Sequence, residues 1–482
     1  MHTYPRSHRT RCPLHVSRRS FLASLAASSA ALKMGLFDFA SEALAADDTP
    51  PGKPVIHAAF ARPDTDRYWM GWPGAAYDIQ ASQKLYTRTL REAAKKLGVA
   101  LQVHEAPLHN TAAADALLEQ LEKAKPDGLV LTCMSLNAGW RPINHFVAKK
   151  GDLPTVVFSP MGTSFTGHLQ PTRDAAKTFV GATQDVRWLA QALRMLKTVW
   201  DMQTTRLCIV RGKESVDRPL DVVGTTLRYI PRSRFPQELK KAEASDEVKA
   251  IADYYTKEAK KIVEPKPQDI LNAATNYVVA RRIMRQEKCH GFSMDCLGLV
   301  GSRIIPCPPC VAWMRLNDDG SVGACEADWN AAISLRLTRL LCDRPGFMQD
   351  PAPNTVSNTL MGAHCSCPSK LAGFDQPHEP FILRSHSESD IGVAPQVLWR
   401  VGQKITIMKF QGPGSIIVGT GKVVANIDTP PSGGCRTSVE VEVDDKPDTR
   451  DTRGFHQLFI YGDLEDEFRA YGQLAGIAVS HI

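Results

Sequence analysis

The sequence predicts an α/β protein with two Rossmann-like parallel-sheet α/β domains followed by a C-terminal antiparallel β-barrel-like domain. Short apolar segments alternate with amphipathic segments from residue 55 to 159, and the same alternation restarts near residue 186. Beyond about residue 385 the hydrophobic period becomes two, with Gly and Pro between the segments. A chain of 482 residues is long enough to fold into several such domains.

The first 46 residues resemble an export signal. Arg18 and Arg19 precede an Ala- and Ser-rich apolar segment at 21–32, and an Ala-Leu-Ala motif ending at Ala45 suits a signal peptidase. Paired arginines before Phe-Leu are typical of the twin-arginine signal. We therefore expect a periplasmic or otherwise exported protein that meets the twin-arginine translocation machinery. No later apolar stretch is long enough to span a bilayer, so no membrane association is expected after signal removal.

The first α/β domain is predicted at 47–190. Gly98 marks the end of its first helix. The expected strands are 55–60, 101–104, 128–132 and 154–159, and the expected helices are 84–97, 112–124 and 140–149.

The second α/β domain is predicted at 191–384, entered through a helix over 186–200. The further expected elements are a strand at 207–210, a charged helical stretch at 237–263, a helix at 270–286, a strand ending at 291–294 and a helix that opens at 323–328. The C-terminal domain, 385–482, is expected to hold strands at 403–410, 415–425, 437–443 and 458–461 and a closing helix at 464–474.

The net charge of +7 does not indicate a nucleic-acid-binding protein. Residues 1–46 hold six basic and two acidic residues, which leaves 52 basic and 49 acidic residues in the rest of the chain. No stripe of basic and aromatic residues occurs, so we expect no nucleic-acid partner. The basic surplus belongs mainly to the predicted signal.

Eleven of the 12 cysteines follow the signal, an odd number for an exported protein. Cys307 and Cys310 form one close pair in sequence, and Cys365 and Cys367 form another. We expect most cysteines to be small buried apolar residues, with one or two disulfides. A redox or zinc role for Cys307 and Cys310 is the alternative.

The most suggestive polar residues lie between 295 and 368 and near 456. Glu326 opens the helix expected there, where it is equally explained as a cap. Asp350 is expected in a turn where a strand ends, and His364 and His456 follow on separate elements. Two carboxylates with histidine suit Mn²⁺ or Mg²⁺, and imidazole favours Mn²⁺.

Two segments carry a resemblance to a known family. Gly-Ala-Cys-Glu-Ala-Asp at 323–328, then a helix ending near 343–347, Asp350 and Ala-His-Cys at 363–365 resemble the active-site stretch of the L-fucose isomerase/L-arabinose isomerase superfamily. The run from Gly454 to Asp463, followed by a terminal helix, resembles the family's C-terminal ending. The predicted order of domains matches as well.

The resemblance implies a metal-dependent aldose–ketose isomerase acting on a free monosaccharide, L-fucose- or L-arabinose-like, through a cis-enediol intermediate. Carried over by position, Glu326, Asp350 and His456 bind the metal, and the two carboxylates shuttle the proton. His364 is a possible fourth ligand or a substrate contact. The family also implies a homo-oligomer, a trimer or hexamer.

Sugar hydroxyls need further polar and aromatic partners, and we expect them at Trp313, Asn354 and His386. Trp313 is equally a core residue, and Arg384 and Glu388 are further candidates that also fit a solvated pair. The alternative function is an exported sugar-binding protein on the same scaffold without turnover, since two α/β domains around a cleft also describe periplasmic binding proteins.

Overall fold

The structure is a computed structural model that describes residues 52–69, 76–429 and 434–482. The predicted export signal at 1–46 lies outside the described residues. Within the described part of the chain, no helix combines the length and the apolar character needed to cross a membrane.

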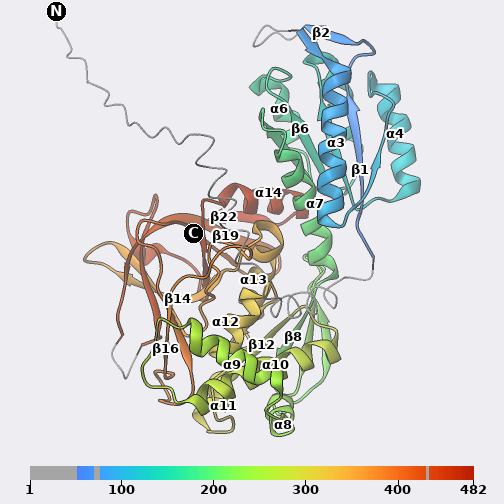
Figure 1. The fold of residues 1–482 in the computed structure, drawn as a ribbon. Helices are drawn as coiled ribbons and strands as arrows, with labels where there is room; N and C mark the ends of the chain where they lie inside the picture. Colours follow the sequence, from blue (N-terminus) through green and yellow to red (C-terminus); the bar gives the residue numbers. More distant parts are fainter. Residues whose placement is uncertain (1–51, 70–75, 430–433) are drawn as a thin grey trace, which may run out of the picture. The chain divides into compact units, whose positions relative to one another are not determined.

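The first sheet contains five parallel strands in the order β4-β1-β5-β6-β7, which confirms the Rossmann-like first domain (Figure 1). Its strands are β1 (Val55–Ala61), β4 (Ala100–Val103), β5 (Gly128–Cys133), β6 (Thr155–Ser159) and β7 (Thr178–Ala182). Its helices are α3 (Ile79–Leu97), α4 (Thr111–Ala124), α5 (Asn137–Val147), α6 (Thr166–Arg173) and α7 (Trp188–Thr204). A hairpin of β2 (Arg67–Trp69) and β3 (Ala76–Asp78) precedes α3.

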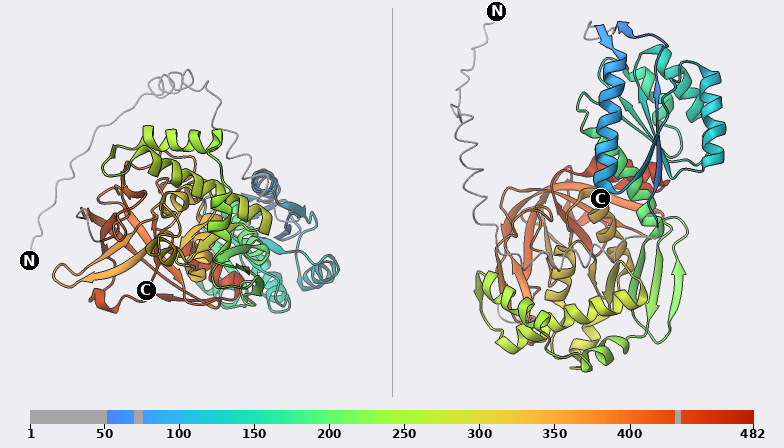
Figure 2. Two further views of the ribbon diagram at one scale, coloured as in Figure 1. Left: turned by 90° about the horizontal axis from the view of Figure 1, so that it is seen from below. Right: turned by 45° about the vertical axis from the view of Figure 1, so that its right-hand side comes forward.

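Side chains of β1 alternate between two apolar layers, as a strand covered on both faces requires. Ile56 and Phe60 pack in the cluster that contains residues of α3 and α7, whereas Ala59 packs with α4 and α5. Figure 2 shows the parallel strands between these helices. The apolar run that predicted a buried strand is thus explained by burial on both faces.

The second sheet has the order β13-β12-β8-β10-β9, and all neighbouring strands are parallel except the β10–β9 pair. Its strands are β8 (Arg206–Val210), β9 (Val216–Pro219), β10 (Thr226–Ile230), β12 (Gly291–Met294) and β13 (Gly323–Cys325). The helices of this region are α8 (Arg234–Lys240), α9 (Asp246–Glu258), α10 (Pro267–Glu287), α11 (Cys296–Gly301), α12 (Cys310–Asp318) and α13 (Trp329–Cys342).

The C-terminal part is a closed antiparallel barrel of six strands, ordered β18-β21-β14-β15-β20-β19 and closed by the β18–β19 pair. The strands are β14 (Phe347–Asn354), β15 (Thr359–His364), β18 (Lys404–Phe410), β19 (Ser415–Asn426), β20 (Thr437–Val443) and β21 (Gln457–Tyr461). After α14 (Glu465–Ala475), the last strand β22 (Ala478–His481) pairs in parallel with β19. A short sheet of β11 (Lys261–Ile262), β16 (Phe381–Arg384) and β17 (Ala394–Val397) and a 3₁₀ turn at Thr449–Asp451 complete the described elements.

Three local expectations differ from the structure. The helix expected to open at 323–328 begins at Trp329, because Glu326 and Ala327 have positive φ angles of 62° and 54° that a right-handed helix cannot contain. Its N-cap is therefore Asp328, not Glu326. Asp350 lies within β14, not in a turn at a strand end.

Candidate metal centre

Three adjacent barrel strands bring two histidines and a carboxylate together. His364 is the last residue of β15, Asp350 lies within β14, and His456 directly precedes β21. β14 lies between the other two strands in the barrel. Gln349 pairs with Gln457, so the next step of the antiparallel register places Asp350 opposite His456.

Glu326 comes from the second parallel sheet, directly after the carboxyl end of β13. This strand is held tightly against α12: a Cβ added at Gly323 would meet the Cα of Trp313 at 2.6 Å. The Asn317 side chain accepts from the Gly323 N–H at 3.1 Å and donates to its carbonyl at 2.8 Å. Close packing and side-chain hydrogen bonds therefore fix the strand that delivers Glu326.

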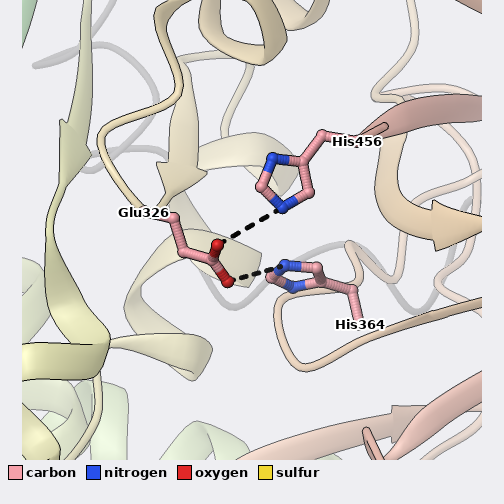
Figure 3. A group of neighbouring side chains, drawn as sticks. All are labelled: Glu326, His364 and His456. Atoms are coloured by element: carbon pink, nitrogen blue, oxygen red, sulfur yellow. Dashed lines mark ion pairs between the residues drawn. The ribbon is translucent and has the colours of Figure 1, made fainter. Parts of the chain in front are cut away.

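Glu326 lies between the two histidines (Figure 3). Its Oε2 is 3.5 Å from His456 Nε2, and its Oε1 is 3.9 Å from His364 Nε2. One ligand atom from each of these three residues lies within 4.8 Å of the others. The group can hold a divalent metal ion, because bonds of about 2.0–2.2 Å from nitrogen and oxygen to a metal need donors at similar separations.

Two buried atoms at this group support a metal role. Within the described residues, His456 Nε2 and Asp350 Oδ1 are both buried and make no hydrogen bond. They approach each other to 3.2 Å. Without a metal these two atoms have ion-pair contacts as their partners, with each other and, for the nitrogen, with Glu326, and a cation placed among these donors would bind both atoms.

The other nitrogen of His456 is held by Asp328. His456 Nδ1 donates to Asp328 Oδ2 at 2.8 Å, while Asp328 Oδ1 accepts from the Ala331 N–H as the cap of α13. Lys409 Nζ lies 3.5 Å from Asp328 and donates to the carbonyl of Phe455. A carboxylate on the far nitrogen of a histidine orients the ring and leaves Nε2 for a metal.

Sequence reasoning missed Asp328 and Lys409 as site residues. A signal for Asp328 was present, because an Asp two residues after a candidate ligand and directly before a helical pattern is a strong N-cap candidate. Lys409 carries no comparable signal. It lies in an ordinary alternating strand, and only the register of the barrel brings it to the site.

Two of the ligands, Glu326 and His456, lie on backbone that non-glycine residues seldom adopt. His456 has a φ of 55°, and Glu326 and Ala327 are also left-handed. Such conformations cost about 1–3 kcal/mol each and persist where surrounding contacts over-determine them. Here they turn the side chains of Glu326 and His456 towards each other.

Burial and neighbouring charges shift the pKa values of the residues in this group in different directions. Burial raises the pKa of Glu326, and the nearby carboxylate of Asp350 adds to this against the opposing effect of His456. Burial alone would lower the pKa of His456, but contacts with Asp328 and Asp350 outweigh it and raise the value to about 9. Burial lowers the pKa of His364. Two neighbouring histidines thus differ in their affinity for protons.

Three of the four predicted ligands form the group itself, and the fourth contacts one of its members. Glu326 and His456 lie in it as expected, and His364, expected only as a possible fourth ligand, is its third member. Asp350 contacts the group through His456. The structure therefore brings all four predicted residues together.

The three residues expected to contact the sugar lie in different parts of the structure. His386 lines the cavity beside Glu326 and His364. Trp313 is 0 % exposed and packs on Phe292, so it belongs to the core. Asn354 is exposed and donates to Glu440 on the barrel surface. Only His386 of these three lies at the site.

The two further candidates do not form a pair with each other. Arg384 makes a bidentate ion pair with Glu264, with a shortest distance of 2.8 Å. Glu388 lines the cavity beside the metal group.

The sequence matches no protein-family model and no curated protein.

Proposed function

We propose that this protein is a metal-dependent aldose–ketose isomerase of the fucose isomerase-like type, acting on a free L-fucose- or L-arabinose-like monosaccharide. The observation that carries the proposal is the group of Glu326, His364 and His456, with the Asp350 carboxylate against His456. The same residues were expected from the resemblance to the L-fucose isomerase/L-arabinose isomerase superfamily.

We propose Mn²⁺ as the metal, with Mg²⁺ as the substitute. Two imidazole nitrogens and a carboxylate favour a borderline ion over a purely oxygen-bound one. When bound, such an ion polarises the sugar carbonyl and stabilises the negative charge of an enediolate.

The isomerisation needs a group that removes a proton from carbon and a group that moves the hydroxyl proton. Glu326 suits the first role because its carboxylate lies beside both histidines of the group, where it would be next to a sugar bound at the metal. Asp350 suits the second, since it opens to solvent and contacts the same histidine. Two carboxylates in different surroundings can hold different protonation states.

The cavity offers polar groups for sugar hydroxyls next to these carboxylates. His386 and Glu388 line it together with Glu326, Asp350 and His364. His386 Nδ1 lies 2.9 Å from Ser389 Oγ, which holds the ring in place. We propose both His386 and Glu388 as hydroxyl partners.

The test is turnover of free aldoses, including L-fucose and L-arabinose, by purified protein with Mn²⁺. Removing a general acid or base should lower kcat by about 10²–10⁴-fold, so Glu326→Gln and Asp350→Asn should each nearly abolish ketose formation. Glu442→Gln is the matched control, because Glu442 is exposed on β20 and pairs with Lys422. Full rate in either site variant contradicts the assignment. A sugar that raises Tm without forming ketose indicates the binding-protein function instead.

We further propose that the chain is exported through the twin-arginine pathway and assembles as a trimer or hexamer. Arg18→Lys with Arg19→Lys should retain the precursor inside the cell, whereas the wild type should be found in the exported fraction. Light scattering of the exported protein tests the assembly, and a monomer contradicts it.

A further inference from the structure

Five cysteines line the cavity beside the metal group, each from a different part of the fold. They are Cys296, Cys310, Cys325, Cys365 and Cys435. All of them are free thiols in this structure. Cys325 directly precedes Glu326, and Cys365 directly follows His364. The wall of the cavity therefore combines hard ligands with an unusual density of thiols.

Three of these thiols form a chain with Cys365 in the middle. Cys365 packs with Cys310 and Ala394 in one buried cluster, and Cys435 packs against it. The charge state of Cys365 is linked to that of both Cys310 and Cys435, since the two members of each pair shift each other's pKa. Cys310 is the first residue of α12, and Cys435 lies just before β20. Elements far apart in sequence thus bring three cysteines together.

Exposure decreases along this chain. Cys435 is half-buried, whereas Cys365 and Cys310 are 5 % and 4 % exposed. A reagent that enters the cavity would meet Cys435 before the other two. Cys435 is therefore the most accessible of the three thiols, and Cys365 and Cys310 are both buried.

A thiolate metal site is the competing explanation, since three cysteines and His386 would be a familiar ligand set for zinc. Among the described residues, however, the only three ligand atoms that lie within 4.8 Å of one another are those of Glu326, His364 and His456. The three cysteines pack together but are not such a converging group. Neighbouring thiols are what thiol–disulfide exchange needs.

We propose that Cys435, Cys365 and Cys310 form a thiol–disulfide relay that ends in a Cys310–Cys365 disulfide beside the metal group. The oxidant is a disulfide, either of low molecular weight or on a partner dithiol protein. This proposal concerns modification of the cavity wall and does not depend on isomerase activity.

The exchange is balanced in atoms and electrons. The Cys435 sulfur attacks the external disulfide, forms a mixed disulfide and releases one thiol. The Cys365 sulfur attacks the mixed disulfide at Cys435, releases the second external thiol and forms a Cys365–Cys435 bond. The Cys310 sulfur then attacks Cys365 and frees Cys435. Two protein thiols are oxidised, one external disulfide is reduced to two thiols, and the two protons pass to those thiols.

Oxidation at Cys365 acts on the metal group because one peptide bond joins Cys365 to His364. Two unbonded sulfurs must approach to about 2.05 Å to form a disulfide, whereas metal–ligand distances tolerate about 0.2 Å. We expect the oxidised protein to bind Mn²⁺ about tenfold more weakly, a change of the size that outer-shell perturbations produce.

The first test maps disulfides in the purified full chain after incubation with oxidised glutathione, followed by alkylation and mass spectrometry of peptides. The expected product links Cys310 to Cys365. Cys310→Ser should stop at a Cys365–Cys435 link, and Cys435→Ser should slow formation of the final link about tenfold, because access is lost. Cys289→Ser is the control: Cys289 is a half-buried thiol outside this cavity and should leave the yield unchanged.

Three results would overturn the relay. One is an unchanged count of free thiols in the folded protein. Another is a set of links that omits Cys365. The third is protection of all three thiols from alkylation by one equivalent of Zn²⁺, retained in the His456→Ala variant, which would identify a metal site instead. Equal Mn²⁺ affinity of oxidised and reduced protein, measured by titration calorimetry, would overturn the coupling to His364.

Discussion

Two pairs of histidines in this protein look alike but differ in chemistry. In the first parallel sheet, His104 Nε2 lies 3.0 Å from His57 Nδ1, with ring centroids 5.0 Å apart. At the end of the barrel, the rings of His364 and His456 are 5.6 Å apart. Both pairs are largely removed from water. Contact between histidines therefore does not distinguish a structural pair from a ligand group.

The difference lies in the carboxylates. Within the described residues, no ion pair joins His57 or His104 to an acidic side chain, and burial lowers the pKa of both. His456 instead faces Asp328, Asp350 and Glu326. In the first pair the two facing nitrogens bond to each other, whereas the second leaves a buried nitrogen and a buried oxygen without hydrogen bonds. Carboxylates around a histidine pair are what make it a candidate metal centre.

The largest expected effect separates the two pairs by metal binding. His456→Ala should weaken Mn²⁺ binding by more than the roughly 100-fold typical of outer-shell changes, because it removes a ligand. His104→Gln should leave the affinity unchanged. Titration calorimetry on both variants measures the Mn²⁺ affinity. Equal affinities would mean that the two histidine pairs do not differ in metal binding.

A smaller loss is expected from the carboxylate behind the ligand. Asp328→Asn keeps the shape but weakens the orientation of His456, so Mn²⁺ affinity should fall about 10–100-fold. Asp253→Asn, at an exposed position of α9, is the matched control. If the two variants bind Mn²⁺ equally, Asp328 serves only as a helix cap.

The two pairs should also respond to pH in opposite directions in metal-free protein. The pKa of His456 is raised to about 9, so its contribution to folding is fully present below pH 6.5 and is lost as pH rises through about 9. The pKa values of His57 and His104 are lowered, so their contribution is present above pH 6.5 and is lost as pH falls below it.

Urea unfolding with a chelator present measures this difference. The unfolding free energy of the wild type relative to His456→Gln should fall by about 1–3 kcal/mol between pH 6.5 and 9. The same comparison for His104→Gln should change below pH 6.5 instead. If the difference in unfolding free energy between the wild type and His456→Gln does not change with pH, the proposed charge on His456 is contradicted.

The smallest effect concerns the hydrogen bond of the structural pair. His104→Gln should destabilise the fold by about 0.5–1.5 kcal/mol, the usual contribution of one such bond. The midpoint of urea unfolding at pH 7.5 measures it. A loss several times larger would show that His104 does more than bond to His57.

The sequence predicts most of the regular elements because their burial follows simple periodicities. β1, buried on both faces, appears as a short apolar run, and β20 appears as a strict alternation. The strands β14 and β15 escape prediction as barrel strands. Pro351 and Pro353 interrupt the pattern of β14, and both strands lie before residue 385, where the character of the sequence changes.

The candidate ligands were predictable, but their arrangement was not. Glu326, Asp350, His364 and His456 stand in recognisable local sequences, whereas their convergence depends on barrel register and on left-handed backbone at two of them. The role of Asp328 and the contacts of Cys365 with Cys310 and Cys435 arise between elements distant in sequence. No local pattern encodes such contacts.

The most direct test of the metal centre is a crystal of the protein soaked in Mn²⁺, with anomalous diffraction measured to locate the ion. We expect one strong peak within bonding distance of Glu326, His364 and His456, about 2.0–2.2 Å from their donor atoms. Absence of a peak there at saturating Mn²⁺, or a peak bound only by other residues, would contradict it.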